Sequence, residues 1–243
     1  MKRQAILIGR TGAANPLAGV NVDLAAYEAF LKSPIGGAWN DEEIKPLLDK
    51  GSFVIYKALD DVPEDTFCLV VYAGHAHTND AGQLVLDIPG GPIYTNENLR
   101  TKAALQLTIL DCCRDSLRIL PPSFPMKLVE SAAALDPGAC RNEFEHQLVL
   151  AKRGHVEILS CSANEKSIEF KQVGGLYSKT LLDEATAWAS TTSRGASSTF
   201  LSIGMAHSRA APVVVQSSGR KQHPVVSSKP MNLEMTIPFA VLA

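Results

Sequence analysis

The chain has 243 residues, of which 46% are hydrophobic and 20% charged, and this fits a single α/β domain over residues 1–243 with a substantial core. A formal net charge of -2 gives no electrostatic reason to expect nucleic acid or a membrane as a partner. The odd number of cysteines is typical of a reducing compartment, and no apolar run is long enough for a signal peptide or a membrane span. We therefore expect a cytoplasmic protein.

The first half of the chain contains short apolar runs separated by amphipathic segments. In chain order, the expected elements are a strand at 5–9, helices at 20–32, 40–48 and 52–59, a strand at 67–73, a hairpin strand at 83–88 and a short helix at 96–104. The helix at 20–32 is predicted from apolar residues that share one helical face. The segment at 52–59 is ambiguous between a helix and a strand.

The second half begins with the apolar run 107–110, which is too short for a helix core and predicts a buried central strand. Proline and turn residues then predict a long loop over 114–154, with a helix near 142–151. The remaining expected elements are a strand at 155–161, helices at 177–188 and 199–207, and a last strand from 213–215 and 224–226.

Two of the predicted strands end in residues that carry chemistry. The strand at 67–73 is followed by His75, and the strand at 107–110 is followed by Cys112 and Cys113. Parallel strands place their carboxyl ends at one edge of an open sheet, so the imidazole and a thiol can be neighbours there. A cysteine nucleophile needs a base to form its thiolate and an acid for the leaving amine, and one histidine can serve both purposes.

The same pattern has other interpretations. A cysteine at a strand end is often a small buried hydrophobic residue, and a lone histidine is often structural. His75 and His77 with Cys112 and Cys113 also offer two nitrogens and two sulfurs to a metal ion. Adjacent cysteines on a strand point to opposite faces, which argues against such a site. We therefore expect no metal and no other cofactor.

The two strand ends resemble known motifs. Residues 71–76 (Val-Tyr-Ala-Gly-His-Ala) resemble the Tyr-Ser-Gly-His-Gly motif of caspase-like cysteine peptidases. Residues 110–116 (Leu-Asp-Cys-Cys-Arg-Asp-Ser) resemble the Asp-x-Cys-His-Ser-Gly motif of metacaspases and their bacterial relatives. Weaker matches at 17–23 and 160–175 flank them in the same order, so the similarity covers about residues 4–188. It implies an α/β fold, a three-layer caspase-like sandwich with a mostly parallel sheet flanked by helices.

The resemblance also implies the catalytic groups. The motifs match His75 and Cys113 to the catalytic dyad, and the backbone N–H groups of Cys113 and Ala76 to the oxyanion donors. Ala76 stands where the family has glycine, and alanine retains the N–H group. Ala73 replaces a serine, and residues 114–116 replace His-Ser-Gly, which changes the loop after the nucleophile.

Two acidic residues match the substrate pocket of metacaspases, namely Asp23 and Asp111. Asp111 lies two residues before Cys113, so strand alternation places both side chains on the same face. A pair of carboxylates binds guanidinium or ammonium groups, which implies cleavage after Arg, with Lys second. The alternative role of Asp23 is a charge that complements the start of a helix.

The resemblance divides the chain into a large-subunit-like region at 1–113, a linker loop at 114–154 and a small-subunit-like region at 155–243. Relatives are cut in this loop on activation, so self-cleavage or cleavage by an activating protease is a hypothesis. The loop contains Lys127, Arg141, Lys152 and Arg153, after which such cleavage could occur. No aspartate cluster follows His75, so calcium dependence is not expected.

The expected partners are protein or peptide substrates with Arg or Lys before the scissile bond, and the protein is expected to be a monomer. By resemblance it would serve regulated proteolysis, such as bacterial antiviral defence. The main rival is a catalytically silent caspase-like interaction module, against which the retention of His75 and Cys113 argues. An α/β hydrolase or a nucleotide-binding domain would need a Gly-x-Ser-x-Gly motif or a phosphate loop, and the chain has neither.

Overall fold

The computed structural model describes residues 1–12, 16–113, 135–192, 199–227 and 236–243. The strands of the central sheet are β1 (Lys2–Arg10), β2 (Ile44–Leu48), β3 (Thr66–Thr78), β4 (Leu84–Leu86), β5 (Ile93–Tyr94), β6 (Leu105–Cys113), β7 (Gly154–Leu159) and β11 (Val225–Val226). The short strands outside it are β8 (Glu169–Phe170), paired with β9 (Gly174–Gly175), and β10 (Phe200–Ser202), paired with β12 (Pro238–Val241). The helices are α1 (Val20–Lys32), α2 (Ser52–Asp60), α3 (Thr95–Asn98), α4 (Pro137–Leu150), α5 (Leu176–Thr191) and α6 (Ile203–Ser217), with a 3-10 turn at Asp41–Glu43.

The central sheet is mostly parallel and follows the order β11-β7-β6-β3-β1-β2. Only β11 at one edge runs antiparallel to its neighbour β7 along this described path. The central strands β3 and β6 have apolar residues on both faces, as expected where helices cover both sides of a parallel sheet. Beyond the end of β1, β3 continues to Thr78 and pairs with β4 in an antiparallel arrangement.

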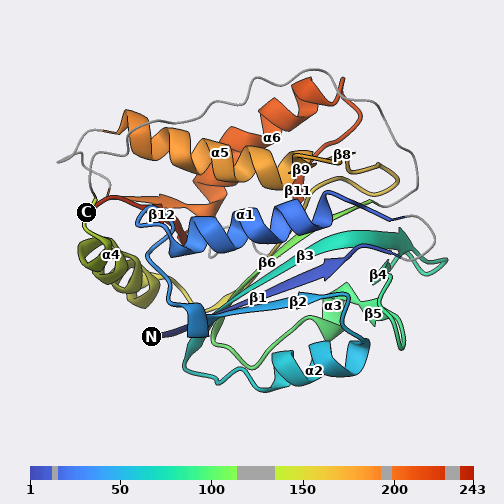
Figure 1. Cartoon of the computed structure of the whole chain (residues 1–243), viewed down its shortest axis with the longest axis horizontal. Helices are drawn as coiled ribbons and strands as arrows, with labels where there is room; N and C mark the ends of the chain where they lie inside the picture. Colours follow the sequence, from blue (N-terminus) through green and yellow to red (C-terminus); the bar gives the residue numbers. More distant parts are fainter. Residues whose placement is uncertain (13–15, 114–134, 193–198, 228–235) are drawn as a thin grey trace.

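Helices cover both faces of the sheet, with α1, α5 and α6 on one side and α2 on the other (Figure 1). Alternate residues of β3 supply the two cores: Leu69 and Val71 pack under α1 and α5, and Val70 and Tyr72 pack toward α2. The expected three-layer sandwich, with a mostly parallel sheet flanked by helices, is therefore confirmed. Among the described residues, no helix has the length and apolar character needed to cross a bilayer.

The helix predicted at 40–48 is wrong. The capping box between Asn40 and Glu43 does form, but it starts only the 3-10 turn, and the chain then enters β2. Pro46 explains the change, because its ring disfavours helical backbone at the preceding residue and its missing N–H is tolerated in an edge strand.

The strand predicted at 213–215 is also wrong, because this valine run lies inside α6. Ser202 caps the helix by accepting a hydrogen bond from the Met205 N–H at 3.2 Å. Ala206, Ala210 and Val214 then recur every four residues, and all three are fully buried. Helical packing of these residues therefore overrides the strand preference of consecutive valines.

Most of the other expected elements are present with shifted boundaries, including the helix at 52–59, the hairpin strand at 83–88 and the strand at 224–226. The helix expected at 96–104 is shortened to α3. The helix expected at 199–207 begins only after β10, at Ile203. The part of the predicted linker loop from 114 to 134 lies outside the described residues, and the remainder contains α4.

Candidate active site

The carboxyl ends of β3 and β6 bring His75 and Cys113 side by side. The two strands are parallel neighbours over their whole paired length, and His75 opposite Cys113 is the last pair of the register. Neighbouring strands lie about 4.8 Å apart, so the backbones of these two residues are adjacent. The number of residues between His75 and Cys113 does not by itself place them opposite each other. The register between β3 and β6 does.

Cys112 lies on the other side of the sheet from the cavity described below. Its side chain is 3% exposed and belongs to the core toward α2, together with Leu110 and Tyr72. Asp111 is directed to the opposite face, toward α5, where it accepts a hydrogen bond from the Ser178 backbone N–H. Cys112 is therefore a buried core residue, as the hydrophobic interpretation of strand cysteines expects.

The backbone around His75 depends on a glycine at position 74. The Tyr72 hydroxyl donates a hydrogen bond of 2.6 Å to the His75 carbonyl, and the Asp87 N–H donates another at 3.0 Å. A Cβ at Gly74 would lie only 2.8 Å from the Tyr72 hydroxyl and 2.8 Å from Arg10 Cβ. Glycine is needed here because a side chain would collide with the groups that hold the histidine backbone.

The Ala76 N–H group is directed away from β4. The bond from the Asp87 N–H to His75 makes these two a hydrogen-bonded pair of the antiparallel ladder, so the next pair, Ala76 with Leu86, is a non-hydrogen-bonded one. The N–H of Ala76 then points to the side opposite β4. The Ala76 N–H, which the resemblance matches to an oxyanion donor, is therefore not hydrogen-bonded to β4.

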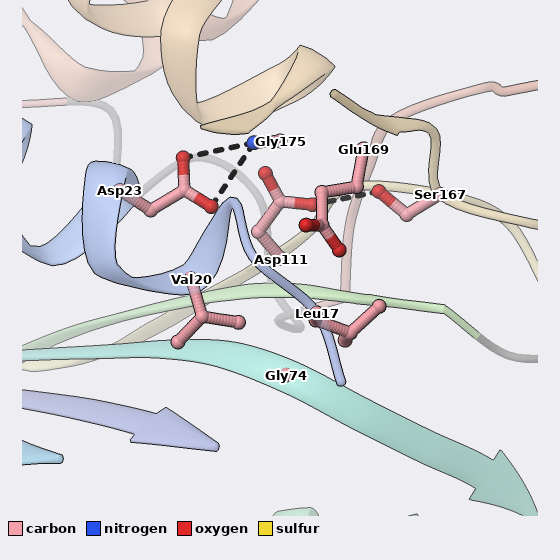
Figure 2. A pocket seen from close by; sticks show the side chains of 8 residues that line it. All are labelled: Leu17, Val20, Asp23, Gly74, Asp111, Ser167, Glu169 and Gly175. Carbon is pink, nitrogen blue, oxygen red and sulfur yellow. Dashed lines mark hydrogen bonds between the residues drawn. The ribbon is translucent and has the colours of Figure 1, made fainter. Parts of the chain in front are cut away.

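A small acidic cavity lies on the face of the sheet covered by α1 and α5. Carboxylates from three different elements point into it: Asp23 from α1, Asp111 from β6 and Glu169 from β8 (Figure 2). The cavity has a volume of about 10 Å³, which is room for about one water molecule. The other lining residues are Leu17, Val20, Gly74, Ser167 and Gly175, so none of the described lining residues is basic.

Backbone and hydroxyl donors hold the two aspartates in place. The Gly175 N–H donates to both oxygens of Asp23, at 2.9 and 3.0 Å. Asp111 accepts from the Ser167 hydroxyl at 2.7 Å through Oδ1 and from the Ser178 N–H at 2.9 Å through Oδ2. These donors partly offset the cost of burying the carboxylates, and they fix the orientation of each carboxylate group.

Burial among other acids perturbs the carboxyl of Asp23. Burial raises its pKa well above its ordinary value, the nearby Asp111 and Glu169 raise it further, and only the Gly175 N–H acts in the opposite direction. Desolvation and like charges both disfavour an ionised carboxylate. Burial and the neighbouring acids therefore favour a neutral Asp23, and a bound cation would favour the charged form.

Two consecutive glycines allow the carboxylates to approach the backbone. A Cβ at Gly174 would lie 2.2 Å from Asp23 Oδ1, and a Cβ at Gly175 would lie 2.3 Å from Asp111 Oδ2. Gly174 also has a φ of +90°, which side-chain-bearing residues rarely adopt. This pair therefore has a structural role at the cavity, in addition to the turn that precedes α5.

The sequence predictions named Asp23 and Asp111, and the structure brings both into the same cavity. They did not assign Glu169, which accepts a hydrogen bond from the Gly19 N–H, or Ser167 to the pocket. The only sequence signal for Glu169 was its place in the weak match at 160–175. Among the described residues, no group of three or more metal-binding side chains has an arrangement that could hold a metal ion.

Comparisons with known proteins agree with this geometry. The family model of the caspase domain matches residues 2–235. The chain belongs to the caspase family. This family contains cysteine peptidases. Membership of the family accounts both for the fold of the chain and for the resemblance of residues 71–76 and 110–116 to peptidase motifs.

Among solved structures, the caspase-like chain is similar to the crystal structure of a protein from Geobacter sulfurreducens. The two are 16% identical and superpose with a TM-score of 0.57, with 100% of each chain covered. At this identity the likeness concerns the fold alone. No curated protein sequence matches the chain.

Proposed function

We propose that this caspase-family protein is a cysteine endopeptidase that cleaves peptide bonds after Arg, and after Lys as the second choice. The observation that carries the proposal is the acidic cavity formed by Asp23, Asp111 and Glu169, close to the strand ends that hold His75 and Cys113. The only charged groups among the described lining residues of this cavity are carboxylates. Aspartate before the scissile bond would be repelled.

The proposed chemistry uses the dyad and two backbone groups. The thiolate of Cys113 attacks the scissile carbonyl carbon, and the N–H groups of Cys113 and Ala76 donate hydrogen bonds to the oxyanion. His75 gives a proton to the leaving amine as the C–N bond breaks, which leaves a thioester on the cysteine. His75 then removes a proton from water, which attacks the thioester and releases the carboxylic acid and the Cys113 thiolate, with His75 protonated again.

Arginine is preferred over lysine because of its shape. A guanidinium is planar and donates paired hydrogen bonds, so it matches carboxylates that are held in fixed planes. Asp111 is held by two donors on different oxygens, and Asp23 by one donor shared between its oxygens. Lysine carries the same charge as a point and gains less from this orientation.

The cavity must widen before such a side chain enters. Its volume of about 10 Å³ is far too small for a guanidinium. The contact between Glu169 and the Gly19 N–H links the segment around β8 to the start of α1, across the cavity. We propose that substrate binding breaks this contact, since the guanidinium offers Glu169 a charged donor in place of a backbone N–H.

Self-cleavage remains part of the proposal for two of the basic residues. Lys152 and Arg153 are exposed in the short connection between α4 and β7. Arg141 is a poor candidate, because it lies in α4 and bonds Glu43 at 2.7 Å. Lys127 lies outside the described residues. Intact-mass analysis of the active protein tests this point, and a fully active uncut chain would contradict it.

The main experiment measures hydrolysis of fluorogenic peptides that end in Arg, Lys or Asp, by wild type and by Cys113→Ala and Cys112→Ala. We expect cleavage after Arg, slower cleavage after Lys and none after Asp. Cys113→Ala should abolish cleavage. Cys112→Ala is the matched control, since it removes the neighbouring thiol from the opposite face of the sheet.

The outcomes separate the alternatives. Loss of activity only in Cys113→Ala supports the nucleophile, and preference for Arg supports the acidic cavity. Preference for Asp would refute the roles of Asp23 and Asp111. No cleavage of any peptide, in cut and uncut protein alike, would favour the silent interaction module.

A further inference from the structure

A fully buried glutamine lies behind the acidic cavity. Gln222 has 0% exposure and belongs to the segment between α6 and β11, outside the residues that line the cavity. Its side-chain amide donates to the Ser160 carbonyl at 2.9 Å and to the Ser167 hydroxyl at 3.3 Å. Its carbonyl oxygen accepts from the Ile168 N–H at 2.9 Å. Gln222 thus contacts the segment that supplies Ser167 and Glu169 to the cavity.

The partners of Gln222 determine which way its amide is oriented. The Ile168 N–H can only donate, so it requires the oxygen of the amide, and the Ser160 carbonyl can only accept, so it requires the nitrogen. The second hydrogen of the amide nitrogen then points to the Ser167 oxygen. Because Ser167 accepts at this position, its own hydroxyl hydrogen is available for Asp111, 2.7 Å away.

We propose that Gln222 is a positioning residue that determines specificity for Arg over Lys. It directs the Ser167 hydroxyl toward Oδ1 of Asp111, while the Ser178 N–H occupies Oδ2. With one donor on each oxygen, the plane of the Asp111 carboxylate is fixed. A planar guanidinium depends on that plane, whereas an ammonium does not. This role rests on the proposed function of the cavity.

A second contact between the same two segments provides a matched control. His223 follows Gln222, and its ring Nδ1 lies 2.6 Å from Glu165 Oε1. The partner of the His223 ring is therefore Glu165 and not Ser167. Glu165 is not among the residues that line the cavity. His223→Ala therefore weakens the attachment of the segment and leaves the Gln222 hydrogen bonds in place.

The experiment determines kcat and KM on matched Arg and Lys peptides for wild type, Gln222→Met, Ser167→Ala, the double variant and His223→Ala. A hydrogen bond contributes on the order of 1 kcal/mol, so we expect the KM for the Arg peptide to rise about 5-fold in Gln222→Met and in Ser167→Ala. The kcat should stay within about 2-fold, and the KM for the Lys peptide should change by less than about 2-fold. The double variant should match Ser167→Ala, since Gln222 acts through that hydroxyl.

Several results would overturn the role. One is an equal rise in KM for the Arg and the Lys peptide in Gln222→Met. Another is the same change in selectivity in His223→Ala, which would make the effect one of general attachment. If Gln222→Met does not fold, Ser167→Ala tests the role by itself. An unchanged ratio of Arg to Lys cleavage in Ser167→Ala would then refute it. A wild-type protein that cuts no Arg peptide refutes the proposed function, and this role with it.

Discussion

Replacing Asp23 with asparagine should stabilise the protein in the absence of substrate and weaken cleavage after Arg. Asp23 is buried near Asp111 and Glu169, and its pKa is raised well above its ordinary value of 3.8. The asparagine carbonyl can still accept the hydrogen bond from the Gly175 N–H, so the change removes the titratable group with little change in shape.

The size of the effect on stability follows from the pKa. A carboxyl whose pKa is raised by folding binds its proton more tightly in the folded state, so ionising it costs about 1.4 kcal/mol of stability for each unit of the rise. This cost is absent below the ordinary pKa, grows as pH increases and is complete above the raised pKa. For a chain of this size, each 1 kcal/mol regained should increase the Tm by about 2–4 °C.

The effect on activity has the opposite sign. Asp23→Asn removes one charged partner of the substrate guanidinium, and a hydrogen bond to a charged group contributes about 1.5–3 kcal/mol. The kcat/KM for Arg peptides should therefore fall about 10- to 150-fold. The control variant Asp41→Asn changes an exposed aspartate in the first turn of the 3-10 helix, outside the cavity lining, and should cleave every peptide nearly as wild type does.

Thermal unfolding of both proteins between about pH 3 and about pH 8, with peptide kinetics at the upper end, measures both effects. The two Tm values should converge at the acidic end and separate in favour of Asp23→Asn as pH rises. A variant that is less stable than wild type at neutral pH, or one that cleaves Arg peptides normally, would refute this account of Asp23 as a buried substrate carboxylate.

Other predictions concern pH, the histidine backbone and the core. The KM of wild type for Arg peptides should fall as pH rises through the raised pKa of Asp23, because a cation binds the ionised carboxylate. A KM that stays constant as pH changes, measured in peptide hydrolysis, would contradict this prediction. Gly74→Ala places a Cβ 2.8 Å from the Tyr72 hydroxyl and should lower kcat/KM about 100-fold by displacing His75, the proposed general acid; activity close to wild type would show that glycine is not needed at this position. Glu43→Ala removes the main partner of the Arg3 guanidinium, whose side chain is 0% exposed, and should cost about 3 kcal/mol in urea unfolding. Its kcat should stay unchanged in the protein that remains folded, since Arg3 lies at the start of β1, away from the strand ends that hold the dyad.

Much of the fold was predictable because it depends on local patterns. The apolar runs of β1, β3 and β6 and the helical spacing of α1 each indicate their element within a few residues. The failures at 40–48 and 213–215 have different origins. At 40–48 a local signal, Pro46, was given too little weight, whereas at 213–215 packing of α6 against α5 outweighed the strand preference of the valines.

The candidate site shows the same division. By itself the sequence determined that an imidazole and a thiol lie toward the carboxyl ends of two buried strands, because a short apolar run that ends in polar residues is a local property. It also indicated Asp23 and Asp111 through resemblance to a family. Only the tertiary structure decided that these carboxylates share one cavity with Glu169, and that Gln222 lies behind them. The physical reason is that such a cavity depends on strand register and on the packing of segments far apart in the chain, which no local pattern encodes.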